Sequence, residues 1–170
     1  MRISTLDTTL RDGAQGCGIS FSLRDKEQII HLLDELGIDI IEAGNPAASP
    51  KDAELLSSRF SLTHARLAAF GATRRKDCAP KDDPALAALG ACNADIAVIF
   101  GKCSLTACRE VIRTTPEENL RMISQSVEYL LSCGKEVIFD AEHFFDSFNE
   151  NPDYALECLR AAQSAGAAQV

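Results

Sequence analysis

Residues 115–140, TPEENLRMISQSVEYLLSCGKEVIFD, contain the unit that decides the fold. Thr115 and Pro116 are typical of a helix start, where an oxygen caps a free N–H group and the N–H that proline lacks is not needed. Gly134 is typical of a helix end. The run from Glu136 to Asp140 has the length and the β-branched and aromatic content of a buried strand. This stretch therefore predicts a helix followed by a strand.

The same alternation recurs along the chain about every 25–35 residues. Caps at Ser22, Ser49, Asp83 and Asn151 predict further helices. Strands are expected at residues 3–10, 38–42, 67–71, 94–100 and 136–140, with the opening of a sixth at 167–170. Mostly apolar strands joined by helices predict a parallel sheet, within one domain over residues 1–170. The pattern alone is compatible with an open doubly wound sheet or with part of an eight-unit (β/α)8 barrel.

The composition excludes several classes of partner. A formal net charge of −8 over 170 residues argues against nucleic acid or an anionic membrane surface. No apolar stretch approaches the roughly 20 residues that span a bilayer, and the first residues lack the apolar core of a signal peptide. The seven cysteines include no C-x-x-C pair, which argues against a zinc cluster or a thioredoxin-like site. We expect a reduced, cytoplasmic protein whose cysteines are mostly buried.

The first strand end contains the adjacent pair Arg11 and Asp12. In parallel βα folds the chemistry lies where strands end and helices begin. Neighbouring side chains of an extended chain point in different directions, so Arg11 could reach a substrate oxygen while Asp12 binds a cation. A guanidinium group is a planar fork for oxygen anions, and hard cations prefer carboxylates. A surface ion pair beside a turn explains the two residues equally well.

Three longer stretches carry a resemblance to a known family. They are LDTTLRDGAQG at residues 6–16, IEAGNPAASPKDAELL at 41–56 and KEVIFDAEHFFDSFNENPDYALECLRAAQSAGA at 135–167. They resemble the synthases of citramalate, 2-isopropylmalate and homocitrate, which share a barrel with hydroxymethylglutaryl-CoA lyase. The third stretch is most similar to the citramalate branch. The resemblance implies a (β/α)8 TIM barrel, incomplete here, with about five βα units and the start of a sixth strand.

The resemblance also implies an activity and a role for each matching residue. The enzyme would be an acyltransferase that condenses acetyl-CoA with a 2-oxo acid, pyruvate in the citramalate branch, in isoleucine or leucine biosynthesis. Arg11 would bind the 2-oxo acid and stabilise the new oxyanion, and Asp12 would bind a divalent metal (Mg, Mn or Zn). Glu142 would belong to the acid–base machinery. Gln15 and Glu42 would line the substrate pocket.

Several of these residues also have plainer interpretations. Glu42 could pair with Lys102 or Arg74 at the barrel mouth, and Glu142 could be a solvated acid at a strand end. We expect His143 to pack or cap rather than bind metal, because no second histidine stands at ligand spacing.

The remaining polar candidates are expected to be structural. The basic loop at residues 74–76 could attract the phosphates of CoA, but a solvated loop is the simpler interpretation. His31 and Glu35 lie one helical turn apart and predict a surface pair. Cys17 is expected to pack.

Two features depart from the family pattern. The family's metal site needs an H-x-H pair near the seventh strand, and the histidines at 31, 64 and 143 form no such pair. We therefore expect the isolated 170-residue chain to be inactive. The segment 102–108 is less aromatic than the citramalate branch leads one to expect, which leaves the choice of 2-oxo acid open. Unpaired strand edges of an incomplete barrel invite association, and we expect a homodimer.

Three alternatives stand beside this hypothesis. The same barrel could belong to a lyase or to a carboxyltransferase. The chain could instead be a non-catalytic fragment that binds a partner through its strand edges. A flavodoxin-like sheet is the third, although no glycine-rich phosphate loop follows the first strand in the expected form.

Overall fold

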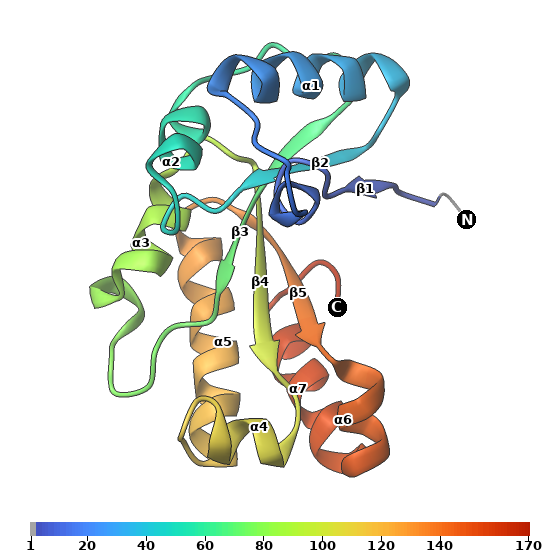
Figure 1. Cartoon of the computed structure of the whole chain (residues 1–170). Helices are drawn as coiled ribbons and strands as arrows, with labels where there is room; N and C mark the ends of the chain where they lie inside the picture. Colours follow the sequence, from blue (N-terminus) through green and yellow to red (C-terminus); the bar gives the residue numbers. More distant parts are fainter. Residues whose placement is uncertain (1–2) are drawn as a thin grey trace.

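Residues 3–170 are described by a computed structural model, in which a curved parallel sheet lies inside a layer of helices (Figure 1). The strands are β1 (Leu6–Asp7), β2 (Ile40–Gly44), β3 (Arg66–Ala72), β4 (Ile96–Lys102) and β5 (Glu136–Glu142). They lie side by side in chain order, and every neighbouring pair is parallel. Gln169 adds a parallel bridge to Ile138, which confirms the predicted start of a sixth strand. The arrangement is that of an incomplete βα barrel.

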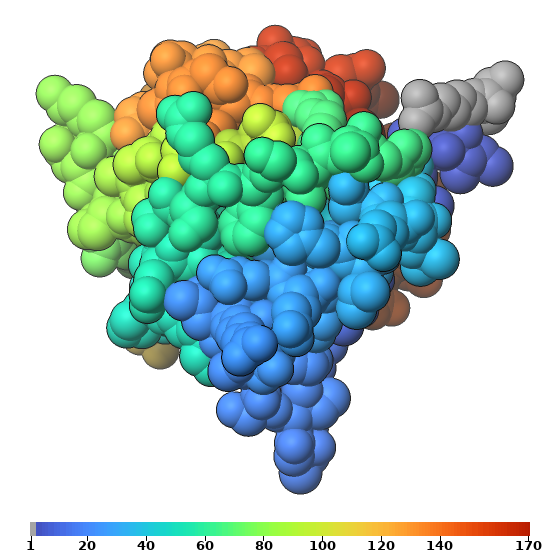
Figure 2. Space-filling model, turned by 90° about the horizontal axis from the view of Figure 1, so that it is seen from above, coloured from blue at the N-terminus to red at the C-terminus, as the bar shows by residue number. Residues whose placement is uncertain are grey.

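Helices cover the outer face of the sheet. They are α1 (Leu23–Leu36), α2 (Pro50–Ser57), α3 (Pro84–Ala91), α5 (Pro116–Ser132) and α7 (Pro152–Ser164). The larger apolar core lies between these helices and the sheet and includes Leu55, Ile99, Val127 and Phe139. Figure 2 looks onto this outer layer, where α1 and α2 pack side by side with the green segment that leads into β3.

The concave inner face of the sheet has a smaller apolar core of its own. Its buried members are Ile40, Ala68, Ile96 and Val98, and Phe70 and Ile138 pack against them. Because side chains alternate between the two faces of a strand, the next inward positions towards the strand ends can be read from the sequence. Those positions are largely polar, and they form the candidate site described below.

The predicted helix caps are confirmed. Ser22 accepts a hydrogen bond from the Asp25 N–H at 3.2 Å, and the Asp25 carboxylate accepts one from the Ser22 N–H at 2.8 Å. This reciprocal pair is a capping box with Asp in place of Glu. Gly37 ends α1 in the left-handed conformation with φ of 86°. The four other predicted caps, at Ser49, Asp83, Thr115 and Asn151, also accept hydrogen bonds at their helix starts.

The prediction for the first strand was too long. Residues 3–10 were expected to be extended, but β1 has only two residues. The Thr8 carbonyl accepts hydrogen bonds from the N–H groups of Arg11, Asp12 and Gly13 at 3.1, 2.8 and 3.1 Å, so the chain turns there. Two short helices, α4 (Leu105–Glu110) and α6 (Phe144–Glu150), were not predicted. Both follow the carboxyl ends of strands, β4 and β5, and lie at one end of the sheet (Figure 1).

The expectation that the cysteines are mostly buried was wrong. Cys103, Cys108 and Cys158 are buried, whereas Cys17 and Cys133 are exposed and the other two are intermediate. Cys17 lies in the exposed loop before α1 rather than packing against the core. Within residues 3–170, no helix combines the length and the apolar character needed to cross a membrane.

Asp34 ties the end of α1 to the segment before β3. Its carboxylate accepts hydrogen bonds from the N–H groups of Thr63, His64 and Ala65 at 2.9, 2.8 and 2.6 Å. These bonds, above all that from Ala65, lower the pKa of Asp34 well below its usual value. A carboxyl with a lowered pKa stabilises the fold above its unfolded pKa, and this contribution is lost as the pH falls.

We therefore expect Asp34→Asn to lower the melting temperature at pH 7. The difference from wild type should shrink as the pH falls below about 4, where the unfolded carboxyl takes up a proton. Thermal melts across pH 2.5–7 measure this. A constant difference over the whole range would contradict the assignment.

Candidate active site

Polar side chains occupy the inner face where the strands end. Glu42 lies on β2, Phe70 on β3, and Phe100 on β4. The register places Phe100 opposite Asp140 and, two residues on, Lys102 opposite Glu142. Two-residue steps keep these side chains on the face that carries the inner apolar core. The strand ends therefore bring several charges and two aromatic rings together.

Arg11 enters this face from the turn after β1. Its Nε–H donates to the Glu42 carboxylate at 2.5 Å, and its guanidinium carbon lies 3.8 Å from the centre of the Phe70 ring. A guanidinium group stacked on an aromatic ring and held by a carboxylate has few orientations left. The residue before Arg11, Leu10, is fully buried and anchors this part of the turn. Arg11 is thus pre-positioned as a cation on the inner face.

Glu42 is a buried acid, with only 1% of its surface exposed. Burial raises its pKa above the usual range, Arg11 offsets part of this rise, and the charges of Asp140 and Asp12 add to it. Among the interpretations of Glu42, pairing with Lys102 or Arg74 is wrong, because its partner is Arg11.

A second ion pair lies across β4 and β5. The Lys102 ammonium donates to the Glu142 carboxylate, and it lies 5.7 Å from the centre of the Phe100 ring. Phe100 stacks on Phe70 with ring centres 5.4 Å apart and planes inclined by 15°. Glu142 ends β5 and is partly exposed, as a solvated acid at a strand end would be, but it is also paired with Lys102. Two stacked rings lie between the two ion pairs.

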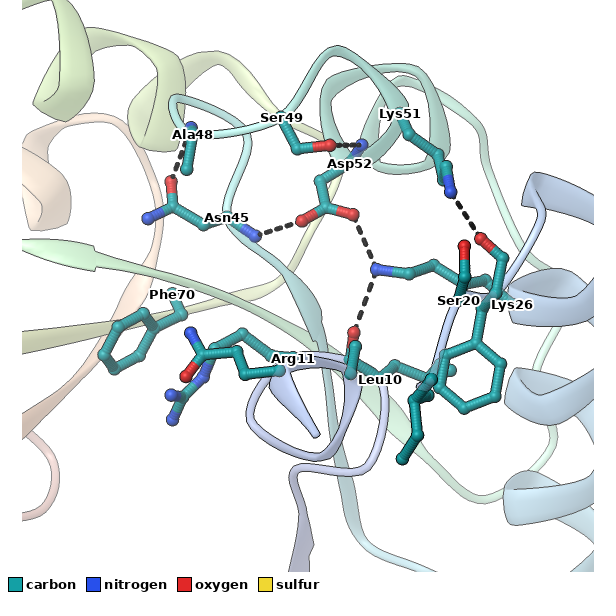
Figure 3. Close-up of a pocket in the computed structure, with 14 residues that line it drawn as sticks. Leu10, Arg11, Ser20, Lys26, Asn45, Ala48, Ser49, Lys51, Asp52 and Phe70 are labelled. Carbon is teal, nitrogen blue, oxygen red and sulfur yellow. Dashed lines mark hydrogen bonds and ion pairs between the residues drawn. The ribbon is translucent and has the colours of Figure 1, made fainter. Parts of the chain in front are cut away.

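A cavity of about 310 Å³ opens between the first loop and the start of α2 (Figure 3). Gln15 and Arg11 line it together, which brings two of the predicted substrate-binding residues into one cavity. On its other side the buried Lys26 donates to the Leu10 carbonyl at 2.9 Å and to Asp52 at 2.6 Å. Figure 3 shows this ammonium group between its two partners.

Lys26 and Asp52 join three segments of the cavity wall. Lys26 also donates to the Ala43 carbonyl at 3.2 Å, and Asp52 accepts from the Asn45 N–H at 3.0 Å. Asp52 can come this close because residue 44 is glycine, since a Cβ at Gly44 would lie 2.5 Å from the Asp52 carboxyl carbon. The pair therefore holds the turn after β1, the end of β2 and α2 at fixed spacing.

Asp12, the predicted metal ligand, is paired with its neighbour. Its carboxylate accepts from the Arg11 guanidinium at 3.1 Å, and 63% of its side chain is exposed. No group of three or more His, Cys, Asp or Glu side chains that could hold a metal occurs among residues 3–170. A divalent ion normally takes several ligands, so these residues alone do not fit a metal site.

His143 precedes α6 in a left-handed conformation, but its side chain is exposed and makes no cap hydrogen bond. The expectation that it packs or caps was wrong. Its Nε2 lies 3.8 Å from the Glu142 carboxylate.

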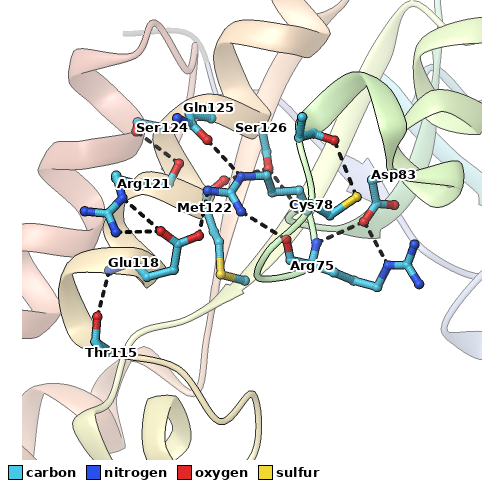
Figure 4. A network of polar contacts seen from close by, with 12 residues as sticks. Arg75, Cys78, Asp83, Thr115, Glu118, Arg121, Met122, Ser124, Gln125 and Ser126 are labelled. Carbon is cyan, nitrogen blue, oxygen red and sulfur yellow. Dashed lines mark hydrogen bonds and ion pairs between the residues drawn. The ribbon is translucent and has the colours of Figure 1, made fainter.

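The loop at residues 74–76 is not simply solvated. Arg74 is buried and donates to Glu118 at 2.8 Å and to Gln125 at 2.9 Å on α5. Figure 4 shows Glu118 also bound to Arg121, and Asp83 bound to Arg75 on the other side of the loop. The interpretation as a solvated loop is therefore wrong for its first residue. This network fixes the loop after β3 on α5.

Four residues that the structure brings to the site were not predicted from the sequence. They are Phe70, Phe100, Lys102 as the partner of Glu142, and Asp140. Two-residue alternation is the signal that could have found them, because Phe70, Phe100 and Asp140 continue the inward apolar positions of their strands. His31 and Glu35 are both exposed. The centres of the His31 and Phe60 rings lie 6.0 Å apart.

Comparison with known sequences gives a consistent set of relatives. A family model described as HMGL-like matches residues 2–170. The (R)-citramalate synthase of Sulfolobus acidocaldarius is 47% identical over 97% of this chain and 32% of its own length. The (R)-citramalate synthase of Aquifex aeolicus is 45% identical over 98% of this chain and 32% of its own length. A homocitrate synthase of S. acidocaldarius is 31% identical over 100% of this chain and 35% of its own length. The chain spans about a third of the length of these curated relatives.

Solved structures show the same architecture. Bacillus subtilis HMG-CoA lyase superimposes with a TM-score of 0.72 at 17% identity, over 96% of this chain and 55% of that one. An Acinetobacter baumannii HMG-CoA lyase in complex with coenzyme A and 3-methylmalate superimposes with a TM-score of 0.70 at 17% identity. The match covers 96% of this chain and 53% of that one. At this level of identity the likeness concerns the fold.

Proposed function

Because the chain belongs to the HMGL-like family, we propose that the protein carrying it condenses acetyl-CoA with a 2-oxo acid, with pyruvate as substrate and citramalate as product. The observation that supports this most is the 47% identity to a citramalate synthase together with the inward Arg11 held by Glu42 and Phe70. The product would enter isoleucine or leucine biosynthesis. We also propose that the protein forms a homodimer.

The proposed role of Arg11 follows from its geometry. Its Nε–H donates to Glu42, whereas one terminal nitrogen donates to the exposed Asp12 carboxylate at 3.1 Å. A fixed guanidinium can bind the carboxylate of a 2-oxo acid and stabilise the alkoxide that forms when the ketone is attacked. Gln15, in the same cavity wall, would contact the same substrate. Glu42 would act by holding Arg11 in place.

Acetyl-CoA would approach from the ends of β3 and β4. A cavity of about 490 Å³ lies there, with Ile112, Met122 and Phe100 in its wall. Arg75 and Lys76 also line it. An apolar pocket edged by cations suits a pantetheine arm followed by phosphates.

Members of the HMGL-like family generally use a divalent metal, and Asp12 is proposed as one of its ligands. When bound, such a metal would polarise the ketone of the 2-oxo acid. Residues 3–170 do not complete that site, so residues 1–170 produced alone are expected to release no CoA with any 2-oxo acid. Metal-dependent CoA release by residues 1–170 would contradict that expectation.

The function is tested with the protein at its natural length. CoA release from acetyl-CoA is followed with a thiol reagent across pyruvate, 2-oxoisovalerate, 2-oxoglutarate and a blank without 2-oxo acid. We expect release with pyruvate to exceed the others by at least about tenfold. Release that is the same in the blank would mean a thioesterase. Cleavage of hydroxymethylglutaryl-CoA in a parallel assay would instead favour a lyase.

A further inference from the structure

The ladder between the first two strands ends before it reaches the candidate site. The last residue pair of β1 and β2 is Asp7 with Ile41. Arg11 follows in the turn at residues 8–13, and Glu42 is the residue after Ile41. In the described part of the chain no backbone hydrogen bond joins this turn to β2. The distance between the backbone of Arg11 and that of Glu42 therefore depends on side-chain contacts.

The ammonium group of Lys26, on α1, connects these two backbone segments. It donates at 2.9 Å to the carbonyl of Leu10, whose peptide bond leads into Arg11. It also donates at 3.2 Å to the carbonyl of Ala43, the residue after Glu42. The register of β2 against β3 shifts around Ala43, and a bulged residue is left out of the ladder, so its carbonyl is available to Lys26. One ammonium group thus joins the segments that carry Arg11 and Glu42.

The third donor of Lys26 is also used. The ammonium group donates to Asp52 on α2 at 2.6 Å, and Figure 3 shows the nitrogen between Asp52 and Leu10. An ammonium group has three N–H donors, which these three oxygens match. Lys26 lines the same cavity as Arg11 and Gln15, but it has no donor left for a substrate. Only 5% of its side chain is exposed, so water competes little for its contacts.

We propose that Lys26 is a positioning residue of the 2-oxo-acid site, which acts by fixing Arg11 relative to Glu42. The proposal rests on the proposed function, because it concerns the cation to which that function assigns the 2-oxo acid. Arg11 is then held twice, by Glu42 and Phe70 through its side chain and by Lys26 through its backbone. A displacement of about 1 Å in a substrate-binding group can lower a rate by about 10²-fold. Acetyl-CoA, with its proposed cavity at the ends of β3 and β4, should be affected far less.

The first experiment removes the ammonium group in the natural-length protein. Lys26→Met is compared with Lys135→Met, since Lys135 also donates to two backbone carbonyls, those of Cys92 and Ala94, at 2.5 and 2.7 Å. Lys135 precedes β5 and lies at the opposite end of the parallel sheet from Arg11. We expect Lys26→Met to lower kcat/KM for pyruvate by about 10–100-fold and to change the dissociation constant of acetyl-CoA by less than about threefold. Lys135→Met should change both by less than about threefold.

A double variant tests whether Lys26 acts through Arg11. If it does, Lys26→Met cannot cost more than Arg11→Gln does. Adding Lys26→Met to Arg11→Gln should then lower kcat/KM for pyruvate by less than about threefold further. Two residues that act independently would give losses that multiply, and this result would overturn the proposal.

Asp52→Asn is a milder variant that keeps the proposal testable if Lys26→Met fails to fold. It leaves the ammonium group with its two carbonyl partners and weakens only the third contact. We expect kcat/KM for pyruvate to fall by about three- to tenfold, with the dissociation constant of acetyl-CoA unchanged. An equal loss of acetyl-CoA affinity would mean a general loss of structure and would overturn the positioning role.

Hydrogen exchange, measured by mass spectrometry, reports on the turn without any substrate. The N–H groups of Arg11, Asp12 and Gly13 are bonded to the Thr8 carbonyl. In Lys26→Met, peptides that cover this turn should exchange at least about tenfold faster, whereas peptides from β4 and β5 should change by less than about threefold. Exchange in the turn should stay at the wild-type rate in the control variant at Lys135.

The outcomes separate this proposal from the proposed function. A wild-type protein that releases no CoA with pyruvate, but whose turn exchanges faster in Lys26→Met, would overturn the function and keep the positioning role. Wild-type release with pyruvate that Lys26→Met leaves within about threefold would keep the function and overturn the positioning role. Exchange of the turn that Lys26→Met leaves unchanged would also overturn it.

Discussion

Arg11→Gln is expected to lower 2-oxo-acid-dependent CoA release by about 10²–10³-fold in the natural-length protein. The substitution removes the only guanidinium that Glu42 and Phe70 hold on the inner face of residues 3–170. A donor aimed at a developing oxyanion contributes most in the transition state, so kcat should fall more than the affinity for acetyl-CoA. Steady-state kinetics with pyruvate at saturating acetyl-CoA measure this.

The control for this substitution addresses Glu42. Without Arg11 the buried Glu42 carboxyl loses the partner that offsets its raised pKa. The stability of the fold would then fall for a reason unrelated to catalysis. The double variant Arg11→Gln with Glu42→Gln replaces the ion pair by two neutral amides. We expect it to melt closer to wild type than the single variant and to stay as inactive. A single variant that keeps its rate within about tenfold would exclude Arg11 as the oxyanion ligand.

Lys26→Met is expected to lower the free energy of unfolding of residues 1–170 by about 3–5 kcal/mol. Lys26 is buried, and its ammonium group satisfies the Asp52 carboxylate and the carbonyls of Leu10 and Ala43. Methionine leaves these largely buried oxygens without their donor. Urea unfolding followed by circular dichroism gives the free energy directly.

Lys51 provides the matched control. It stands next to Asp52 on α2, and its ammonium group donates to the Phe21 carbonyl at the surface. Lys51→Met should change the free energy of unfolding by less than about 0.5 kcal/mol. Equal losses in the two variants would mean that a general effect of charge, rather than the buried contacts of Lys26, accounts for the result.

Local sequence rules predicted most of the fold because each rule concerns only neighbouring residues. Ser22 with Asp25 and Thr115 with Pro116 define helix starts through contacts within one turn, and the structure has them. The first strand is shorter than predicted because the Thr8 carbonyl accepts three N–H hydrogen bonds and the chain turns there. The helices α4 and α6 were missed because each is a single short segment placed by the strand end that precedes it.

The partners within the site depend on contacts between distant segments, which the sequence alone could not supply. Glu42 could have paired with any of several cations, and only the curvature of the sheet brings Arg11 to it. Arg74 was predicted to lie in a solvated loop, but it is buried against α5. Asp140 could have been selected from two-residue alternation along β5. The catalytic and metal-binding roles of the residues stay predictions.

The most direct test of the account follows the acetyl carbon into the product. The natural-length protein is incubated with acetyl-CoA that carries 13C in its methyl group, with pyruvate and with a divalent metal, and the mixture is analysed by 13C NMR. The account predicts that the label appears in the methylene carbon of citramalate while an equal amount of CoA is released. Label that stays in acetyl-CoA, or that appears in acetate whether or not pyruvate is present, would contradict it.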